Sequence, residues 1–319
     1  MSPQTEAADG QVVALTGGIG GAKLCLGLQR ILPPGALRVI VNTGDDFEHL
    51  GLAICPDLDT TLYTLAGLAN AQLGWGRNEE TWTFLRVLES LGGPTWFRLG
   101  DADLALHVER TRRLRAGETL TSVTSDLSRR LGVCSEIMPM SDQPVRTMVD
   151  TTDGELAFQE YFVRRRCEPA VIGLRFCGAD HAQVAEAAAQ ACRAPSLRAI
   201  LIAPSNPYLS IDPALAIPGM REALRAGGVP VIAVTPIVAG TAVKGPTAKI
   251  MRELGLSPSP LTVCEHYRGL IDGFVLDERD ARLAAAMDLP VRLCDTLMQT
   301  IEDRERVARC ALELAADLA

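Results

Sequence analysis

The sequence predicts an α/β fold, with a Rossmann-like core built on a parallel or mixed sheet and a mostly helical insertion. Three observations predict it. An apolar strand at residues 11–16 is followed by a glycine-rich loop and a helical repeat of apolar residues, and a second apolar strand begins at Leu37. The pattern becomes helical between residues 74 and 138. Alternating strands and helices return near residue 197, as in parallel sheets covered on both faces.

We expect the chain of 319 residues to be organised in three regions. Residues 1–10 are polar and acidic and are predicted to form a disordered tail. Residues 11–73 and 139–319 are predicted to form the Rossmann-like core, and residues 74–138 the helical insertion. Within the core, Asp153-Gly154 lies between two strand-like runs, and this dipeptide is the strongest hairpin signal in the chain.

The composition argues against several classes of protein. Hydrophobic residues make up 47% of the chain and charged residues 22%, and the mean hydropathy is +0.14, as in ordinary globular enzymes. No apolar run reaches the roughly 18 residues that cross a bilayer. The net charge of −8 argues against non-specific binding to nucleic acid. The start of the chain matches neither a signal peptide nor a transit peptide, so we expect a cytoplasmic protein without a nucleic-acid or membrane partner.

The nine cysteines contain no CxxC pair, which indicates reduced thiols in the core and no zinc site. The four histidines share no close spacing and form neither a metal-binding nor a catalytic pattern. Chemistry based on the glycine-rich loop and on carboxylates therefore becomes the main hypothesis.

The loop after the first strand lacks side-chain bulk, so its backbone N–H groups can approach an anion. The N-terminus of the following helix adds roughly half a positive charge. A Walker A loop would need Gly-Lys-Ser/Thr where Ala22-Lys23-Leu24 stands, and a dinucleotide fingerprint would need glycine at Lys23. Two interpretations stay open: a phosphate site, or a tight turn that needs glycine for positive φ. The candidate residues are Thr16, Gly17, Gly18, Gly20, Gly21 and Lys23.

Four aspartates follow within fifteen residues: Asp45, Asp46, Asp57 and Asp59. The first two lie at the carboxyl end of the second strand, where open α/β sheets bind ligands. Such a cluster of oxygen ligands suits a Mg²⁺ ion that keeps some of its waters and contacts phosphate. Two alternatives remain. One acid after the second strand can bind a ribose, as in dehydrogenases, and Asp59 can cap the helix that follows it.

Two further loops combine small polar residues with prolines. One contains Ser141 and Asp142, and the other contains Ser205 and Asn206. The second loop follows a strongly apolar strand, which places it at the same ligand-binding edge of the sheet. Either loop taken alone is more typical of an ordinary turn.

Taken in order, these segments resemble one family, the 2-phospho-L-lactate transferases of deazaflavin coenzyme F-420 biosynthesis. A single matching word is unspecific, whereas the ordered set, which extends from about residue 11 to residue 298, is highly specific. The matching words are GGIGGAK, VNTGDD, PDLDTTLYTLAG, GWG, LGDADLALH, PMSDQPV, PSNP, IPGMREAL, VKGPTAK, DERD and DTLM.

The resemblance implies a transferase with a Rossmann-type core and a helical insertion, usually a homodimer. Family members take a guanosine-diphospho donor whose outer phosphate carries phospholactate, phosphoenolpyruvate or 3-phosphoglycerate as the acid. They move the phospho-acid group to the terminal ribityl hydroxyl of the deazaflavin Fo and release GMP. No motif in this sequence indicates which acid the donor carries.

The resemblance also assigns residues. Asp59 and Arg98 match positions that contact the deazaflavin. The glycine loop, Ser141-Asp142 and Ser205-Asn206 match segments that contact the guanine nucleotide and its phosphates. Some relatives carry Glu where Asp45 stands, so the resemblance transfers the acidity of that position rather than an exact ligand role.

Phosphoryl transfer depends on positioning and charge neutralisation more than on covalent chemistry. We therefore expect Mg²⁺ as the cofactor, held by some of the catalytic acids Asp45, Asp46 and Asp59. Amide groups of the glycine loop would hold phosphate oxygens, assisted by Lys23. Asp59 has an alternative role as the base that accepts the ribityl proton. Two other functions stay open: a sugar-nucleotide-binding regulatory protein of the same superfamily, and an NAD(P)-dependent oxidoreductase.

Overall fold

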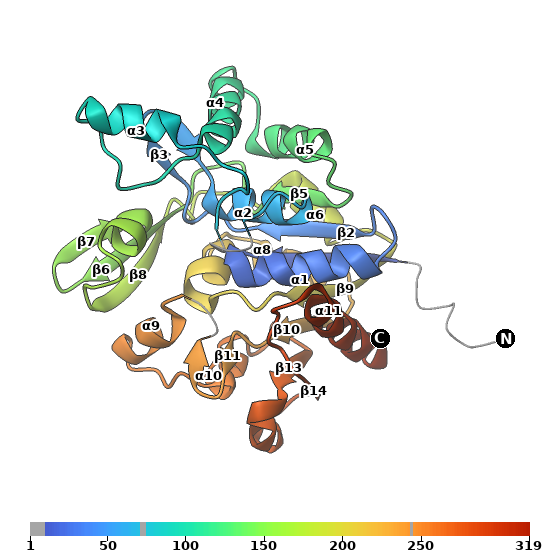
Figure 1. The fold of residues 1–319 in the computed structure, drawn as a ribbon. Coiled ribbons are helices and arrows are strands. Elements are labelled where there is room, and N and C mark those ends of the chain that lie inside the picture. The colour runs from blue at the N-terminus through green and yellow to red at the C-terminus, as the bar shows by residue number, and fades with distance from the viewer. Residues whose placement is uncertain (1–9, 71–74, 243–244) are drawn as a thin grey trace.

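A computed structural model describes residues 10–70, 75–242 and 245–319 (Figure 1). The expected tail lies outside the described residues except for Gly10. Gly74, the first residue of the expected helical insertion, also lies outside them. Within the described ranges, no helix is long and apolar enough to span a membrane.

A seven-stranded parallel sheet forms the centre of the molecule. The chain builds it outwards from β1 to one edge and then, starting at β9, to the other edge. This is the doubly wound order of Rossmann folds, and it confirms the predicted α/β class. The order is β14 (Val291–Cys294), β13 (Gly273–Asp277), β10 (Val231–Val234), β9 (Leu197–Ile202), β1 (Gln11–Thr16), β2 (Leu37–Val41) and β5 (Glu136–Pro139).

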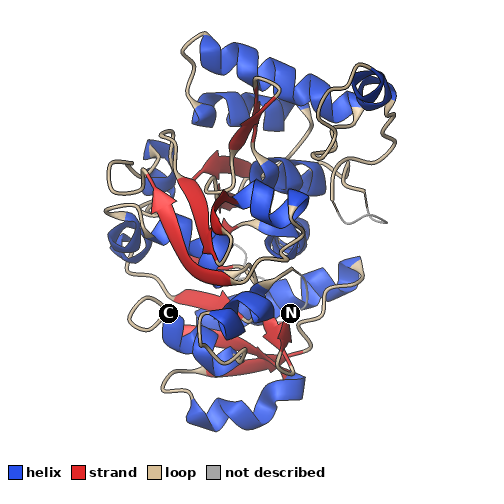
Figure 2. Cartoon of the chain, turned by 90° about the vertical axis from the view of Figure 1, so that its left-hand side faces the viewer, coloured by secondary structure: helices blue, strands red, loops and turns tan. Residues whose placement is uncertain are grey.

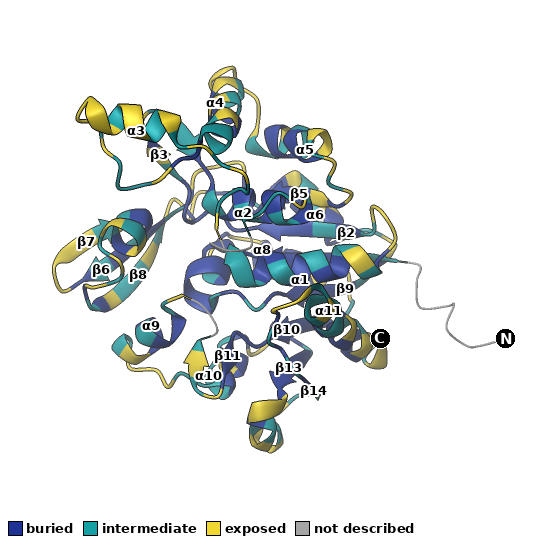
Figure 3. Ribbon diagram, viewed as in Figure 1, coloured by how far each residue is buried: buried dark blue, intermediate teal, exposed yellow. Residues whose placement is uncertain are grey.

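Helices cover both faces of the sheet, whose strands are mostly buried (Figure 3). The side chains of β1 alternate between two hydrophobic cores. Val12 and Ala14 belong to one core, whereas Val13 and Leu15 belong to the other. Because both faces are buried, the strands are continuous apolar runs. The first core contains α1 (Gly18–Ile31), α2 (Pro56–Leu65), α5 (Leu120–Arg130) and α11 (Ile301–Asp317). The second contains α6 (Glu186–Ala191), α8 (Met220–Ala226) and α10 (Pro260–His266).

The segment between β2 and β5 is mostly helical. It contains α2, α3 (Thr83–Ser90), α4 (Asp101–Arg115) and α5. It also contains a hairpin of β3 (Phe47–His49) and β4 (Leu52–Ile54), which the sequence analysis did not predict. The hairpin turn holds Leu50 at a φ of 54° and Gly51 at 73°.

A smaller antiparallel sheet lies beside the main one, with β6 (Arg146–Thr151) between β7 (Gly154–Ala157) and β8 (Val171–Cys177) (Figures 1 and 2). Thr151 pairs with Gly154, whose φ is 110°, so the predicted hairpin at Asp153-Gly154 is confirmed. The remaining elements are η1 (Glu160–Arg164), η2 (Pro207–Ile211), α7 (Asp212–Leu215), β11 (Ile237–Val238), β12 (Thr241–Ala242), α9 (Thr247–Glu253) and η3 (Glu278–Ala286).

The packing of α1 against α11 generates a first prediction. A Cβ atom at Gly27 would overlap the carbonyl oxygen of Arg304, so Gly27→Ala forces one helix to move. We expect the free energy of unfolding to fall by at least about 2 kcal/mol in urea denaturation. Arg30→Ala, which removes an exposed ion pair with Glu305 on the same helix pair, should cost at most about 1 kcal/mol. Unchanged stability of Gly27→Ala would contradict this packing.

Candidate functional site

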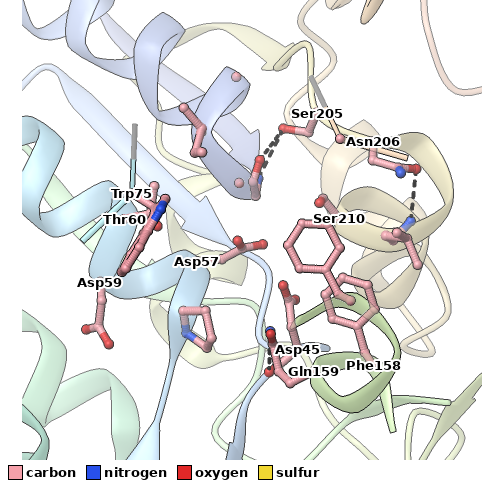
Figure 4. A pocket seen from close by; sticks show the side chains of 18 of the residues that line it. Asp45, Asp57, Asp59, Thr60, Trp75, Phe158, Gln159, Ser205, Asn206 and Ser210 are labelled. Atoms are coloured by element: carbon pink, nitrogen blue, oxygen red, sulfur yellow. Dashed lines mark hydrogen bonds between the residues drawn. The ribbon is translucent and has the colours of Figure 1, made fainter. Parts of the chain in front are cut away.

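A cavity of about 630 Å³ opens at the carboxyl ends of the central strands (Figure 4). The loops after β1 and β9 both line it, and these are the strands between which the chain reverses its direction of winding. Open α/β sheets bind ligands at this point, because neighbouring loops there diverge to opposite faces of the sheet. The cavity also receives residues from α2, from α4 and from the small antiparallel sheet region.

The glycine loop needs glycine for two different reasons. Gly18 has a φ of 66°, which favours glycine. At Gly17 a Cβ atom would overlap the carboxylate of Asp57, and at Gly20 it would lie 2.7 Å from the carbonyl oxygen of Pro204. The loop also begins the 14-residue helix α1, so its backbone lies at the positive end of a helix dipole. The loop is thus both a tight turn that requires glycine and a helix N-terminus, which is a position that favours anions.

Ser205 ties the loop after β9 to the glycine loop. The backbone N–H of Gly17 donates to Ser205 Oγ at 3.2 Å, and the same hydroxyl lies 2.8 Å from the Gly17 carbonyl oxygen. Asn206 also lines the cavity. Its Oδ1 accepts from the backbone of Tyr208 and Leu209, while its buried Nδ2 has no hydrogen-bond partner among the described residues. The amide nitrogen of this cavity-lining residue is therefore a buried donor that the described residues leave without an acceptor.

Asp45 and Asp57 form an acidic pair that points into the cavity (Figure 4). Both are buried, and both accept hydrogen bonds from the side-chain nitrogen of Asn42, which follows β2. No Lys or Arg in the described ranges forms an ion pair with either acid. Burial and the nearby charges of Asp57 and Asp46 raise the pKa of Asp45 well above its ordinary value, and burial raises the pKa of Asp57 to about 6. Burial thus disfavours the ionised form of both acids, and no cation among the described residues compensates their charge.

Asp46 is separated from this pair. It is buried but does not line the cavity, and burial raises its pKa to about 7, although the charge of Arg146 opposes the rise. Its Oδ1 has no hydrogen-bond partner among the described residues. The two adjacent acids of the sequence therefore occupy different surroundings.

Asp59 lines the cavity, but its side chain points away from Asp45 and Asp57 (Figure 4). Arg110, which is 2% exposed, donates from Nη1 to Oδ2 at 3.0 Å and from Nη2 to Oδ1. The alternative interpretation of Asp59 as a helix cap is wrong, because α2 begins at Pro56 with Cys55 as its N-cap residue. Asp59 instead lies in the first turn of α2, where negative charge is favourable.

The acids can be compared with the requirements of Mg²⁺. The described residues contain no group of three or more His, Cys, Asp or Glu arranged to hold a metal ion. Mg²⁺ commonly uses only one or two carboxylates and completes its coordination with waters and substrate phosphates. Asp45 and Asp57 fit that requirement, since they are close together, face the cavity and have no cationic partner within residues 10–70, 75–242 and 245–319. The carboxylate of Asp59 is already bound by Arg110.

The other sequence-predicted residues divide into two groups. Lys23 lines the cavity and donates to the carbonyl oxygen of Met298 at 2.7 Å. Ser141 and Asp142 do not line it: the Ser141 hydroxyl donates to the Gln183 carbonyl at 2.7 Å, and an Asp142 carboxylate oxygen accepts from the backbone of Thr121. Thr16 and Gly21 lie beneath the loop, where a Cβ atom at Gly21 would overlap the Thr16 hydroxyl.

Aromatic side chains line another part of the cavity. Arg98 lies over the ring of Trp82 at 4.4 Å and near that of Trp75 at 5.9 Å, and such contacts hold a guanidinium in place. Phe158 and Phe162 stack with ring centroids 5.3 Å apart, on the segment that follows β7. These two phenylalanines were not predicted for the site, because no local motif marks them. The predicted metal ligands included Asp59 but not Asp57, although both lie in the word PDLD.

The chain was compared with families and proteins of known sequence. It matches the model of the family described as "2-phospho-L-lactate transferase CofD" over residues 12–308. A phosphoenolpyruvate transferase of Streptomyces griseus is 39% identical over 317 residues, which are 97% of this chain and 99% of that protein. A 2-phospho-L-lactate transferase of Methanosarcina acetivorans is 38% identical over 306 residues, covering 95% and 98% of the two chains.

The comparison with solved structures supports the same fold. The crystal structure of a UPF0052-family protein from Bacillus halodurans superimposes with a TM-score of 0.63 and 15% sequence identity. The match covers 95% of this chain and 99% of that chain. At this level of identity the likeness concerns the fold alone.

The acidic pair generates a second prediction, with a defined sign. Folding raises the pKa of Asp57 from 3.8 to about 6, so the folded protein ionises it less readily than the unfolded chain does. Stability conferred by the neutral acid is present below about pH 4 and is lost as the pH rises through about 6. In metal-free protein, Asp57→Asn should therefore raise the free energy of unfolding at about pH 7.5 by on the order of 2 kcal/mol.

This gain should shrink as the pH falls towards about 3, where the wild-type carboxyl becomes neutral in both states. Chemical denaturation in EDTA at several pH values measures it. Asp180→Asn, at a side chain that is 74% exposed and outside the cavity, is the matched control and should change little. A loss of stability in Asp57→Asn at about pH 7.5 would show that its hydrogen bonds outweigh the cost of the buried charge.

Proposed function

The chain belongs to the 2-phospho-L-lactate transferase CofD family, and we propose that it moves a phospho-carboxylic acid from a guanosine-diphospho donor to the deazaflavin Fo, releasing GMP. Transfer of a phospho-group follows from the family. The donor nucleotide and the acceptor are the proposal. The observation that carries it is a single cavity with a glycine loop and an acidic pair in one part and an aromatic, arginine-containing wall in another.

The glycine loop suits the diphosphate. Its backbone lies at the N-terminus of α1 and approaches the cavity without side chains. The buried Nδ2 of Asn206 adds a neutral donor at the same wall. The Ser205 hydroxyl forms hydrogen bonds with the backbone of Gly17, so we assign it to holding the glycine loop and not to binding the ligand. Fixed donors of this kind stabilise charge on a transferring phosphate without having to reorganise.

Asp45 and Asp57 would hold Mg²⁺, in place of the larger set expected from the sequence. When bound, the ion neutralises charge on the diphosphate and on the leaving GMP. Asn42 orients the two carboxylates. Because no described Lys or Arg forms an ion pair with them, a bound cation would compensate their charge. We assign Asp46 no direct contact, because it does not line the cavity.

The aromatic wall suits the flat ring system of Fo. Trp75, Phe158 and Phe162 line the cavity and offer faces and edges for stacking. Arg98, which the resemblance assigns to deazaflavin binding, is preorganised by Trp82. The resemblance assigns Asp59 to deazaflavin binding as well, and Arg110 holds its carboxylate in one orientation.

We also propose that the protein is cytoplasmic and forms a homodimer. Light scattering of the purified protein can test the homodimer.

The names of the relatives point to two donor acids, phosphoenolpyruvate and 2-phospho-L-lactate, at 39% and 38% identity. The difference is too small to choose between them. The assay therefore incubates the protein with Fo, Mg²⁺ and each of three donors, with phospholactate, phosphoenolpyruvate or 3-phosphoglycerate as the acid. Chromatography with mass detection then follows GMP and the deazaflavin product.

We expect equal amounts of GMP and deazaflavin product with one of the donors. Asp57→Asn should lower kcat at least a hundredfold, because positioning of the diphosphate and its cation would be lost. Asp180→Asn should retain the wild-type rate. Folded protein that is stabilised by GDP but forms no product with any donor would favour the nucleotide-binding regulator, and stabilisation by NAD(P) alone would favour the oxidoreductase.

Arg98 provides a separate prediction for the acceptor. Arg98→Ala should raise the KM for Fo about tenfold or more and leave the KM for the donor within about twofold. Arg129→Ala, which removes a 72% exposed arginine from α5, is the matched control. Steady-state kinetics with each substrate varied in turn measure both constants. An unchanged KM for Fo in Arg98→Ala would remove this residue from the acceptor site.

A further inference from the structure

A buried network of polar side chains joins α2 to α4 beside the cavity. It runs from Asp59 through Arg110 and His107 to Asp103 and Tyr63. All except Arg110 line the cavity. Three of the five come from the word LGDADLALH and the residues just after it, which the resemblance matched without assigning them a role. The network therefore holds chemistry that the proposed function has not yet used.

The two acids of this network differ in how many of their carboxylate oxygens are bound by protein groups. Both oxygens of Asp59 are bound by Arg110, so this carboxylate is committed to an ion pair. Asp103 uses only one oxygen. Its Oδ1 accepts from the Tyr63 hydroxyl at 2.6 Å and lies 3.2 Å from His107 Nε2. None of the described residues donates a hydrogen bond to its Oδ2, and the side chain is 16% exposed at the cavity wall.

The neighbours of Asp103 also fix its charge and orientation. Arg110 can only donate, so its contact of 3.3 Å makes His107 Nδ1 an acceptor and places the hydrogen of the neutral ring on Nε2, which lies 3.2 Å from Asp103 Oδ1. Burial alone would raise the pKa of Asp103, but the nearby His107 ring, the hydrogen bond from the Tyr63 hydroxyl and the charge of Arg110 outweigh it, so the pKa is lowered. The backbone N–H of Asp103 donates to Glu80, which anchors this turn of α4. The result is a rigid carboxylate with one oxygen facing the cavity.

We propose that Asp103 is the carboxylate that binds the acceptor hydroxyl and accepts its proton, with Tyr63 and His107 as positioning residues. The inference rests on the proposed function, since it assigns a role at the same cavity. The hydroxyl oxygen of the acceptor forms a bond to the outer phosphorus of the donor. The bond from that phosphorus to the bridging oxygen breaks, and its electron pair leaves with GMP. The hydroxyl proton passes to Asp103 Oδ2 and then to solvent.

This role suits a carboxylate of low pKa. In a loose phosphoryl-transfer transition state the attacking oxygen carries little positive charge until late, so a weak base that orients the hydroxyl is sufficient. Asp59 is less suited, because accepting a proton would break its bidentate pair with the buried Arg110 and leave that charge unpaired.

The test uses the full chain with Fo, Mg²⁺ and the donor that the wild-type protein accepts. Asp103→Asn keeps the shape of the side chain and removes its basicity. We expect kcat to fall at least a hundredfold while the KM for the donor and the thermal shift caused by GDP with Mg²⁺ stay within twofold of wild type. Asp103→Glu, which keeps a carboxylate, should recover part of the lost rate. Asp101→Asn changes an acid in the same helical turn that lies outside the cavity, and should keep the wild-type kcat.

A wild-type kcat in Asp103→Asn would overturn the proposal, and so would a fall in kcat matched by an equal loss of donor binding, which indicates a structural role. If Asp103→Asn does not fold, Tyr63→Phe takes its place, because it removes one hydrogen bond to Oδ1 and leaves the charge. It should lower kcat about fivefold at unchanged donor KM, and no change would overturn the proposal. Absence of GMP release from the wild-type protein would instead reject the proposed function.

Discussion

The pairing of β1 with β2 on one side and β9 on the other is the constraint on which the rest of the molecule depends. Because all three strands are parallel, their carboxyl ends meet at one edge, while their connections must diverge to opposite faces of the sheet. The divergence leaves an opening between these connections. The glycine loop, the Ser205 loop and the acids after β2 are drawn together there, although they are separated by as many as 188 residues in the chain.

Charge compensation divides the acids around this opening into two kinds. Asp59 has a full partner in Arg110, and Asp103 has two hydrogen-bonding neighbours that favour its ionised form. In the part of the chain that the structure describes, Asp45 and Asp57 form no ion pair and share the neutral amide of Asn42. A buried carboxylate without a cation is costly, and such strain is typical of a site that waits for a ligand. The four acids therefore differ less in position than in how far neighbouring groups compensate their negative charge.

Much of the fold could be predicted from the sequence because it is encoded locally. Continuous apolar strands, the glycine loop before α1 and the Asp153-Gly154 turn each leave a signal within a few neighbouring residues. The β3 and β4 hairpin was missed because its strands have three residues each and its turn uses Leu50 at positive φ. The site was only partly predictable for a similar reason. The partner of Asp59 lies 51 residues further along the chain, and Phe158 reaches the cavity from a different sheet.

Asn42 has a consequence for how ligand binding in this cavity would depend on a cation. Its one side-chain nitrogen donates to both acids and approaches the Leu209 carbonyl at 3.4 Å, while its oxygen accepts from the Gly44 backbone at 2.8 Å. The amide sets the direction of two negative groups without neutralising either. A lysine in its place would orient them too, but it would also supply the missing charge. On the proposed function, the affinity for nucleotide thus becomes thermodynamically linked to the concentration of free divalent cation.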